Sequence, residues 1–168
     1  MVLYHGSSIQ GLKKLVPQER RKRAAGDPAC VYAAIKAKVA APFMVSTMDD
    51  SWAVFGQYNQ DPEYYLVVVE PRFREQGKAG GSLYTVANIG LTTEPEIGLG
   101  EDEWHCEAEV PVLSEEHWPS ALAAMVHYGV KVVFLTPGQF AEFRDAADQY
   151  PLIQLSTPRG DGTFTITG

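Results

Sequence analysis

The segment 64–69, with the sequence YYLVVV, limits the possible folds more than any other part of the chain. Its residues are apolar at successive positions rather than at alternate ones, so both faces of a strand formed there would have to be covered. A strand of this kind belongs at the centre of a sheet. The segment therefore predicts a domain whose sheet is centred on these residues.

Short strand and helix patterns follow one another along the rest of the chain. We expect strands at 2–6, 30–33, 82–87, 103–112, 130–135 and 152–155, and helices at 34–41, 137–150 and from an N-cap at Ser114 to Gly129. The glycine- and threonine-rich segment 88–101 is expected to be a loop long enough to act as a lid. Residues 153–168 are expected to end in an edge hairpin or a loose tail. This mixture predicts an α+β fold.

Size and composition predict one globular domain over residues 1–168. The 168 residues, 45% of them hydrophobic, are enough to bury a core without disulfides or metal ions. The N-terminus has no basic leader before an apolar stretch, and the apolar runs are short, so we expect a cytoplasmic protein with no membrane partner. Cys30 and Cys106 lie within strand-like segments and are expected to be reduced, buried thiols.

The charge distribution is uneven. The net charge of −7 argues against a broad electrostatic grip on nucleic acid. Between Lys13 and Arg23, however, there are six basic residues and one acidic residue, Glu19. This segment therefore has a net charge of +5, and the rest of the chain has −12. Two interpretations stay open for this segment: a solvated loop, or a loop that contacts the phosphate of a nucleotide or of a nucleic acid.

Three short motifs, LYHGSS, VYAA and CEAEVPV, occur in the order His5, Tyr32 and Glu109. This order resembles the ADP-ribosyltransferase superfamily, in the branch that includes the poly(ADP-ribose) polymerases and the rifamycin-modifying transferases and, more distantly, the RNA 2′-phosphotransferases. The resemblance implies split, mixed or antiparallel sheets flanked by helices. It also implies NAD⁺ as the co-substrate and a protein, nucleic acid or small molecule as the acceptor of ADP-ribose.

The resemblance assigns four residues to NAD⁺ binding. His5 can bond a ribose hydroxyl through a ring nitrogen, and the backbone of Gly6 can approach the nicotinamide carboxamide because no Cβ intervenes. Ser7 belongs to the same turn. Tyr32 offers a rigid aromatic face on which the nicotinamide ring could stack. Taken one at a time, a histidine or a tyrosine at such a position is more often a structural residue of the core, so the functional roles of His5 and Tyr32 depend on the ordered motifs.

Two glutamates are the expected catalytic residues. Glu107 and Glu109 are two positions apart on the predicted strand 103–112, so both side chains would leave the same face. Breaking the bond between nicotinamide and ribose develops positive charge on the sugar, which a carboxylate stabilises. By the superfamily's Glu-x-Glu pattern, Glu109 holds the ribose 2′-hydroxyl and Glu107 orients the acceptor. The alternative for the pair is a solvated acidic stripe.

Other kinds of site are not supported. Cys30, Cys106, His5 and His105 do not have the spacing of zinc ligands, and the alternating pattern places Cys106 on an apolar face, unsuited to a nucleophile. We therefore expect no metal. The chain has neither a P-loop nor a Rossmann glycine motif. It also lacks the Ser-Thr-Ser strand of the arginine-directed toxins and the Arg-His-Arg-Arg set of the RNA 2′-phosphotransferases.

Two other functions stay open. The chain could be a catalytically silent module of the same fold that binds NAD⁺, ADP-ribose or nucleic acid. It could also be a partner-binding domain in which Trp52, Trp104 and Trp118 serve as core or interface anchors.

Overall fold

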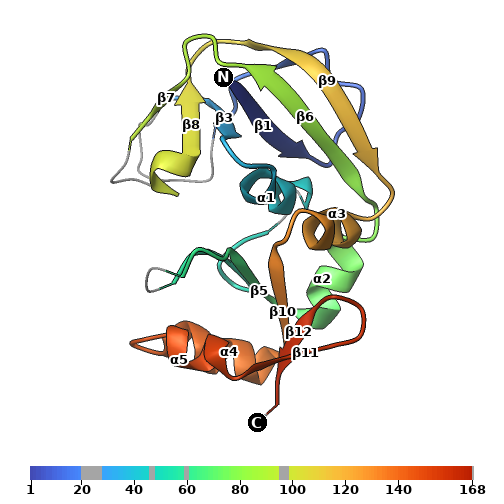
Figure 1. Cartoon of the computed structure of the whole chain (residues 1–168), viewed down its shortest axis with the longest axis vertical. Coiled ribbons are helices and arrows are strands. Elements are labelled where there is room, and N and C mark those ends of the chain that lie inside the picture. The colour runs from blue at the N-terminus through green and yellow to red at the C-terminus, as the bar shows by residue number, and fades with distance from the viewer. Residues whose placement is uncertain (20–27, 46–47, 59–60, 95–98, 168) are drawn as a thin grey trace.

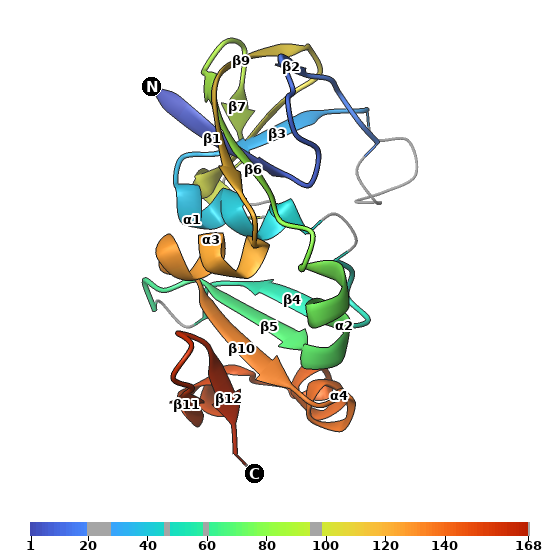
Figure 2. The ribbon, with the colours of Figure 1, turned by 90° about the vertical axis from the view of Figure 1, so that its right-hand side faces the viewer.

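A computed structural model describes residues 1–19, 28–45, 48–58, 61–94 and 99–167. They form two β-sheets with short helices between and around them (Figures 1 and 2). Most of the first sheet comes from the N-terminal two thirds of the chain, whereas the second sheet includes the C-terminal strands. This arrangement confirms the predicted α+β fold with mixed and antiparallel sheets flanked by helices.

The first sheet has seven strands, each antiparallel to its neighbours, in the order β2-β9-β6-β1-β3-β8-β7. Its strands are β1 (Val2–Ser7), β2 (Lys14–Leu15), β3 (Val31–Ala34), β6 (Gly81–Ala87), β7 (Thr92–Thr93), β8 (Glu103–Cys106) and β9 (Val110–Trp118). Strand β1 lies at the centre of this order. Its pairing with β6 and β3 positions the candidate site described below.

The second sheet is mixed, in the order β11-β12-β10-β5-β4. Its strands are β4 (Ala53–Gly56), β5 (Tyr65–Val69), β10 (Lys131–Leu135), β11 (Ser156–Pro158) and β12 (Phe164–Ile166). Strand β5 runs parallel to β10 and antiparallel to β4. Leu66, Val67 and Val68 of β5 have no exposed surface, which confirms that this segment is a strand covered on both faces. The expectation that the sheet is centred on this segment is wrong, because β10 is the middle strand and β5 lies between β10 and the edge strand β4.

The helices are short, and two of them lie between the sheets. They are α1 (Ala37–Ala40), α2 (Glu70–Gln76), α3 (Ala121–His127), α4 (Pro137–Asp145) and α5 (Tyr150–Gln154), with the 3₁₀ turns η1 (Ala41–Met44) and η2 (Gly100–Asp102). Both views place α1 and α3 between the two sheets (Figures 1 and 2). Among the described residues, no helix has the length and apolarity needed to cross a membrane.

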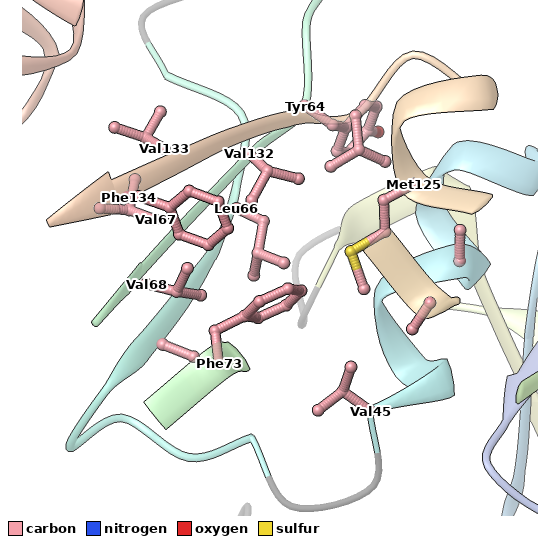
Figure 3. Close-up of a cluster of buried hydrophobic side chains, with 14 of the residues drawn as sticks. Val45, Tyr64, Leu66, Val67, Val68, Phe73, Met125, Val132, Val133 and Phe134 are labelled. Carbon is pink, nitrogen blue, oxygen red and sulfur yellow. The ribbon is translucent and has the colours of Figure 1, made fainter. Parts of the chain in front are cut away.

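The larger hydrophobic core surrounds the second sheet. It combines strand residues such as Leu66 with Phe73 of α2 and Met125 of α3, all at most 1% exposed (Figure 3). Phe73 meets Phe134 of β10 edge to face, with 5.5 Å between the ring centroids. These contacts hold α2 and α3 on the sheet by burial of apolar surface, the main stabilising term in folding.

A second, smaller core lies on the first sheet. Leu3 of β1, Val31 of β3, Val86 of β6 and Val110 of β9 form its centre, and Leu15 of β2 completes it. β2 pairs with β9 and contributes Leu15 to this core. The segment between β1 and β2 therefore crosses the sheet from its central strand to the edge next to β9. That segment forms part of the candidate site.

The sequence-based prediction for residues 103–129 is wrong in two places. The predicted strand 103–112 is interrupted, because β8 ends at Cys106 and β9 begins only at Val110. The helix expected from Ser114 begins later, with Ser120 as its N-cap. Residues 114–118 pair instead with β6, and this ladder outweighs the local capping preference of Ser114.

The C-terminal prediction is also corrected. The single helix expected over 137–150 ends at Asp145. No strand forms at 152–155, because residues 152–154 belong to helix α5 and Leu155 is its C-cap. Helix α5 has Pro151 in its first turn, where proline is well tolerated. The expected terminal hairpin is confirmed, since β11 and β12 pair antiparallel. The helix expected at 34–41 is shorter, because α1 ends at Ala40 and the chain continues as the 3₁₀ turn η1, which has Pro42 in its first turn. The expected loop 88–101 contains β7 and the start of η2, while its residues 95–98 are outside the described part of the chain.

Candidate functional site

The backbone ladder between β1 and β3 is short, and the place where it is not continued defines the candidate site. Strand β1 pairs with β6 along its full length, from Val2 to Ser7. Within the described chain, the register with β3 contains one pair, Tyr4 opposite Ala34. Because the two strands are antiparallel, the end of β1 at Gly6 and Ser7 faces the start of β3 without a continuous ladder. We call this place the β1–β3 opening.

The side chain of His5 occupies the point at which the ladder ends. Its Nδ1 lies 2.7 Å from the backbone carbonyl oxygen of Tyr32, which only accepts hydrogen bonds, so Nδ1 carries the proton and donates. Burial lowers the pKa of His5, and the bond to Tyr32 opposes that effect only in part. The ring is therefore neutral at pH 7, and its Nε2 is left as an acceptor.

A cleft of about 790 Å³ extends from this opening. Its volume lies within the range of about 300–1,000 Å³ usual for small-molecule sites. The cleft is lined by the end of β1, the segment that follows it, β3, the α1–η1 turn and part of β4. The four residues expected to bind the cofactor, His5, Gly6, Ser7 and Tyr32, all line it.

Gly6 has a packing role that the sequence did not reveal. A Cβ at this position would lie 2.0 Å from the carbonyl oxygen of Ala40 and 3.2 Å from the backbone nitrogen of Met44. The glycine therefore allows β1 to approach the α1–η1 turn closely. This contact supplies a structural reason for Gly6 beside the expected one of access to a ligand.

The two glutamates expected to be catalytic are not among the residues that line the cleft. Glu107 and Glu109 lie in the turn between β8 and β9 rather than on a strand, and both are exposed. Glu109 pairs with Lys14 at 2.8 Å, and both side chains are more than half exposed. The structure thus brings His5 and Tyr32 together and leaves Glu107 and Glu109 outside that group.

Four other carboxylates line the cleft within the described residues, Glu19, Asp49, Asp50 and Glu103. Only Glu103 is buried, with 6% of its surface exposed. It begins β8 and stands opposite Ala34 of β3. Sequence reasoning missed Glu103, although it falls in the same alternating pattern as Glu107 and Glu109. Of these three glutamates, Glu103 is the one that lies within a regular strand.

Two aromatic side chains, Phe43 and Phe55, form an aromatic wall of the cleft. Phe43 and Phe55 both line the cleft and meet edge to face, with 6.2 Å between centroids. Phe55 stacks on Tyr64 at 5.6 Å, and the hydroxyl of Tyr64 donates to Asp102. Burial, together with Asp102, raises the pKa of Tyr64. With Tyr32, this wall gives the cleft aromatic surface suited to planar rings.

The remaining sequence hypotheses have plain structural outcomes. Cys30 and Cys106 are buried and do not form a disulfide, as expected. Among the described residues, no cluster of three or more His, Cys, Asp or Glu side chains could hold a metal ion. In the basic segment, Lys13 and Lys14 are exposed, whereas 20–23 are outside the described residues.

Comparisons of the chain with protein-family models, with curated proteins and with solved structures found no match.

Proposed function

We propose that the cleft binds NAD⁺ and that the protein transfers ADP-ribose from it to an acceptor. The observation that carries this proposal is the meeting of His5 and Tyr32 at the β1–β3 opening, inside a cleft of about 790 Å³. His5 and Tyr32 of the sequence motif both line this cleft, whereas Glu109 of the same motif does not.

In this proposal, residues that line the cleft bind the ribose and the aromatic rings of NAD⁺. The neutral ring of His5 accepts a hydrogen bond from a ribose hydroxyl at Nε2, because Nδ1 is committed to Tyr32. The ring of Tyr32, with the aromatic wall of Phe43 and Phe55, provides surface for the nicotinamide and adenine rings.

The reaction breaks the bond between the ribose C1′ and the nicotinamide nitrogen. The bonding electrons leave with nicotinamide, C1′ bonds to the acceptor, and the acceptor loses a proton. Positive charge develops on the sugar, and a carboxylate held in a low-dielectric site stabilises it. Among the cleft's described acids, the buried Glu103 fits this task best, in the place first expected of Glu109.

The test is calorimetric binding of NAD⁺ together with release of nicotinamide, for the native protein and for Glu103→Gln and Glu109→Gln. We expect Glu103→Gln to slow release by about 10²–10³-fold and Glu109→Gln to leave it unchanged. The opposite pattern would return the catalytic role to Glu109. No binding at millimolar NAD⁺ would overturn the proposal as a whole.

A second candidate function is a silent module of the same fold that binds NAD⁺ or ADP-ribose without turnover. The position of Glu107 and Glu109 outside the cleft favours it, because the carboxylates of the motif do not reach His5 and Tyr32. Binding of NAD⁺ with no nicotinamide release, in the native protein and in both variants, would establish this function instead.

A further inference from the structure

The segment that follows β1, residues 8–12, is held down by two side chains from distant strands. Three of its backbone groups bond to them. The hydroxyl of Tyr84 on β6 lies 2.8 Å from the carbonyl oxygen of Ile9 and accepts from the N–H of Leu12 at 3.3 Å. The N–H of Gly11 donates to Oε1 of Glu115 on β9 at 3.0 Å.

Glu115 is the centre of this arrangement. Besides the N–H of Gly11, its Oε1 accepts from the Ser82 hydroxyl at 2.7 Å and lies 3.0 Å from the Tyr84 hydroxyl. The bond from Gly11 and the bond from Ser82 lower the pKa of Glu115. Hydrogen bonds to an ionised acceptor are stronger than neutral ones, so the exposed carboxylate gives Gly11 a charge-assisted bond, while the buried Tyr84 supplies the other two bonds.

Tyr84 and Glu115 are aligned with His5 across three neighbouring strands. His5, Tyr84 and Glu115 stand opposite one another on β1, β6 and β9, so they share one face of the sheet. The rings of His5 and Tyr84 are 6.5 Å apart between centroids. Within the same segment, Ser8, Ile9 and Leu12 line the cleft.

We propose that Glu115 is a positioning residue that, with Tyr84, fixes residues 8–12 as one wall of the cleft and so sets the affinity for NAD⁺. Glu115 is not among the residues that line the cleft and acts through the backbone of Gly11. The identity of the ligand in this inference rests on the proposed function, whereas the anchoring of residues 8–12 does not.

The anchoring is tested first in the protein without ligand, by hydrogen exchange of the Gly11 and Leu12 amides. In Glu115→Ala we expect both amides to exchange about ten-fold faster, as loss of a charge-assisted bond implies. Glu116→Ala is the matched control, because Glu116 is the next residue on β9 and its carboxylate bonds the hydroxyl of Tyr128 instead. Unchanged exchange in Glu115→Ala would overturn the anchoring.

The effect on the ligand is tested with the same variants. For Glu115→Ala we expect the Kd and KM for NAD⁺ to rise about ten-fold, with nicotinamide release at saturation within about two-fold of native. Tyr84→Phe, which removes a single oxygen atom, should change the same constants in the same direction, and it replaces Glu115→Ala if that variant does not fold.

The outcomes separate the two proposals. Faster exchange with unchanged affinity would overturn the positioning role and leave the proposed function standing. A fall in release at saturation, with unchanged KM, would also overturn it, because Glu115 would then act on the reaction itself. Absence of NAD⁺ binding by the native protein would overturn the proposed function and the affinity claim together, while the exchange result would still decide the anchoring.

Discussion

His5 and Tyr32 are joined where their strands part, by a bond of 2.7 Å from the imidazole Nδ1 of one to the backbone carbonyl oxygen of the other. A side chain thus occupies a place where backbone groups would otherwise continue the ladder. The bond fixes both the orientation and the tautomer of the ring, and leaves Nε2 as the atom that can meet a ligand.

The first prediction concerns the pH dependence of stability. Because burial lowers the pKa of His5 in the folded protein, the unfolded chain binds a proton more readily near pH 6. The contribution of His5 is therefore complete above the unfolded pKa of about 6.5 and declines as the pH falls toward the lower folded pKa. Urea unfolding at pH 7.5 and 5.5 should show a smaller pH difference for His5→Gln than for the native protein. An equal difference in both would contradict the lowered pKa.

The second prediction is that Gly6→Ala destabilises the protein. Its Cβ would lie 2.0 Å from the carbonyl oxygen of Ala40, and the atom in the way belongs to the backbone. We expect a loss of about 1–3 kcal/mol or more in the free energy of unfolding. Gly138→Ala in α4 is the control, since nothing lies within 4 Å of its Cβ, and a gain of about 0.5–1 kcal/mol is expected there. Equal melting temperatures for both variants would contradict this packing.

The third prediction is that Glu109→Gln has little effect on stability. Its ion pair with Lys14 joins two side chains that are more than half exposed, so water screens the attraction. We expect a loss of about 0–1 kcal/mol at low salt, and less as salt is added. Denaturant unfolding at two salt concentrations measures it. A loss well above this range would show that the turn between β8 and β9 contributes more than a surface contact.

The fourth prediction tests the core around β5. Leu66 has no exposed surface, so Leu66→Ala removes apolar contacts and leaves a cavity. We expect a loss of about 2–5 kcal/mol in the free energy of unfolding. Leu113→Ala is the matched control, because Leu113 is 59% exposed on β9. A similar loss for both leucines would mean that the core is not centred on β5.

Much of the fold could be predicted from local patterns, and the errors have physical causes. The apolar run at 64–69 and the short strands around His5 and Tyr32 were found because their patterns depend on burial alone. The late start of α3 could not be found in this way. Ser114 is a good N-cap in isolation, but residues 114–118 pair with β6, a partner about thirty positions earlier in the chain.

The candidate site was predicted in part for a similar reason. His5, Gly6, Ser7 and Tyr32 were selected by motif order, and all four line the cleft. Glu103 was missed because alternation of polar and apolar residues continues through the turn after Cys106, so the pattern does not reveal where the strand ends. The anchoring by Glu115 joins residues 104 positions apart, and no local pattern reports such a contact.

The single register pair between β1 and β3 has a mechanical consequence. Within the described residues, this one pair joins the strands β2-β9-β6-β1 to the strands β3-β8-β7 of the first sheet. A molecule bound across the β1–β3 opening would contact both groups of strands and would link them. Its binding would make the sheet more rigid where the ladder between β1 and β3 is short. The bound molecule would then contribute to the rigidity of the site as much as the chain does.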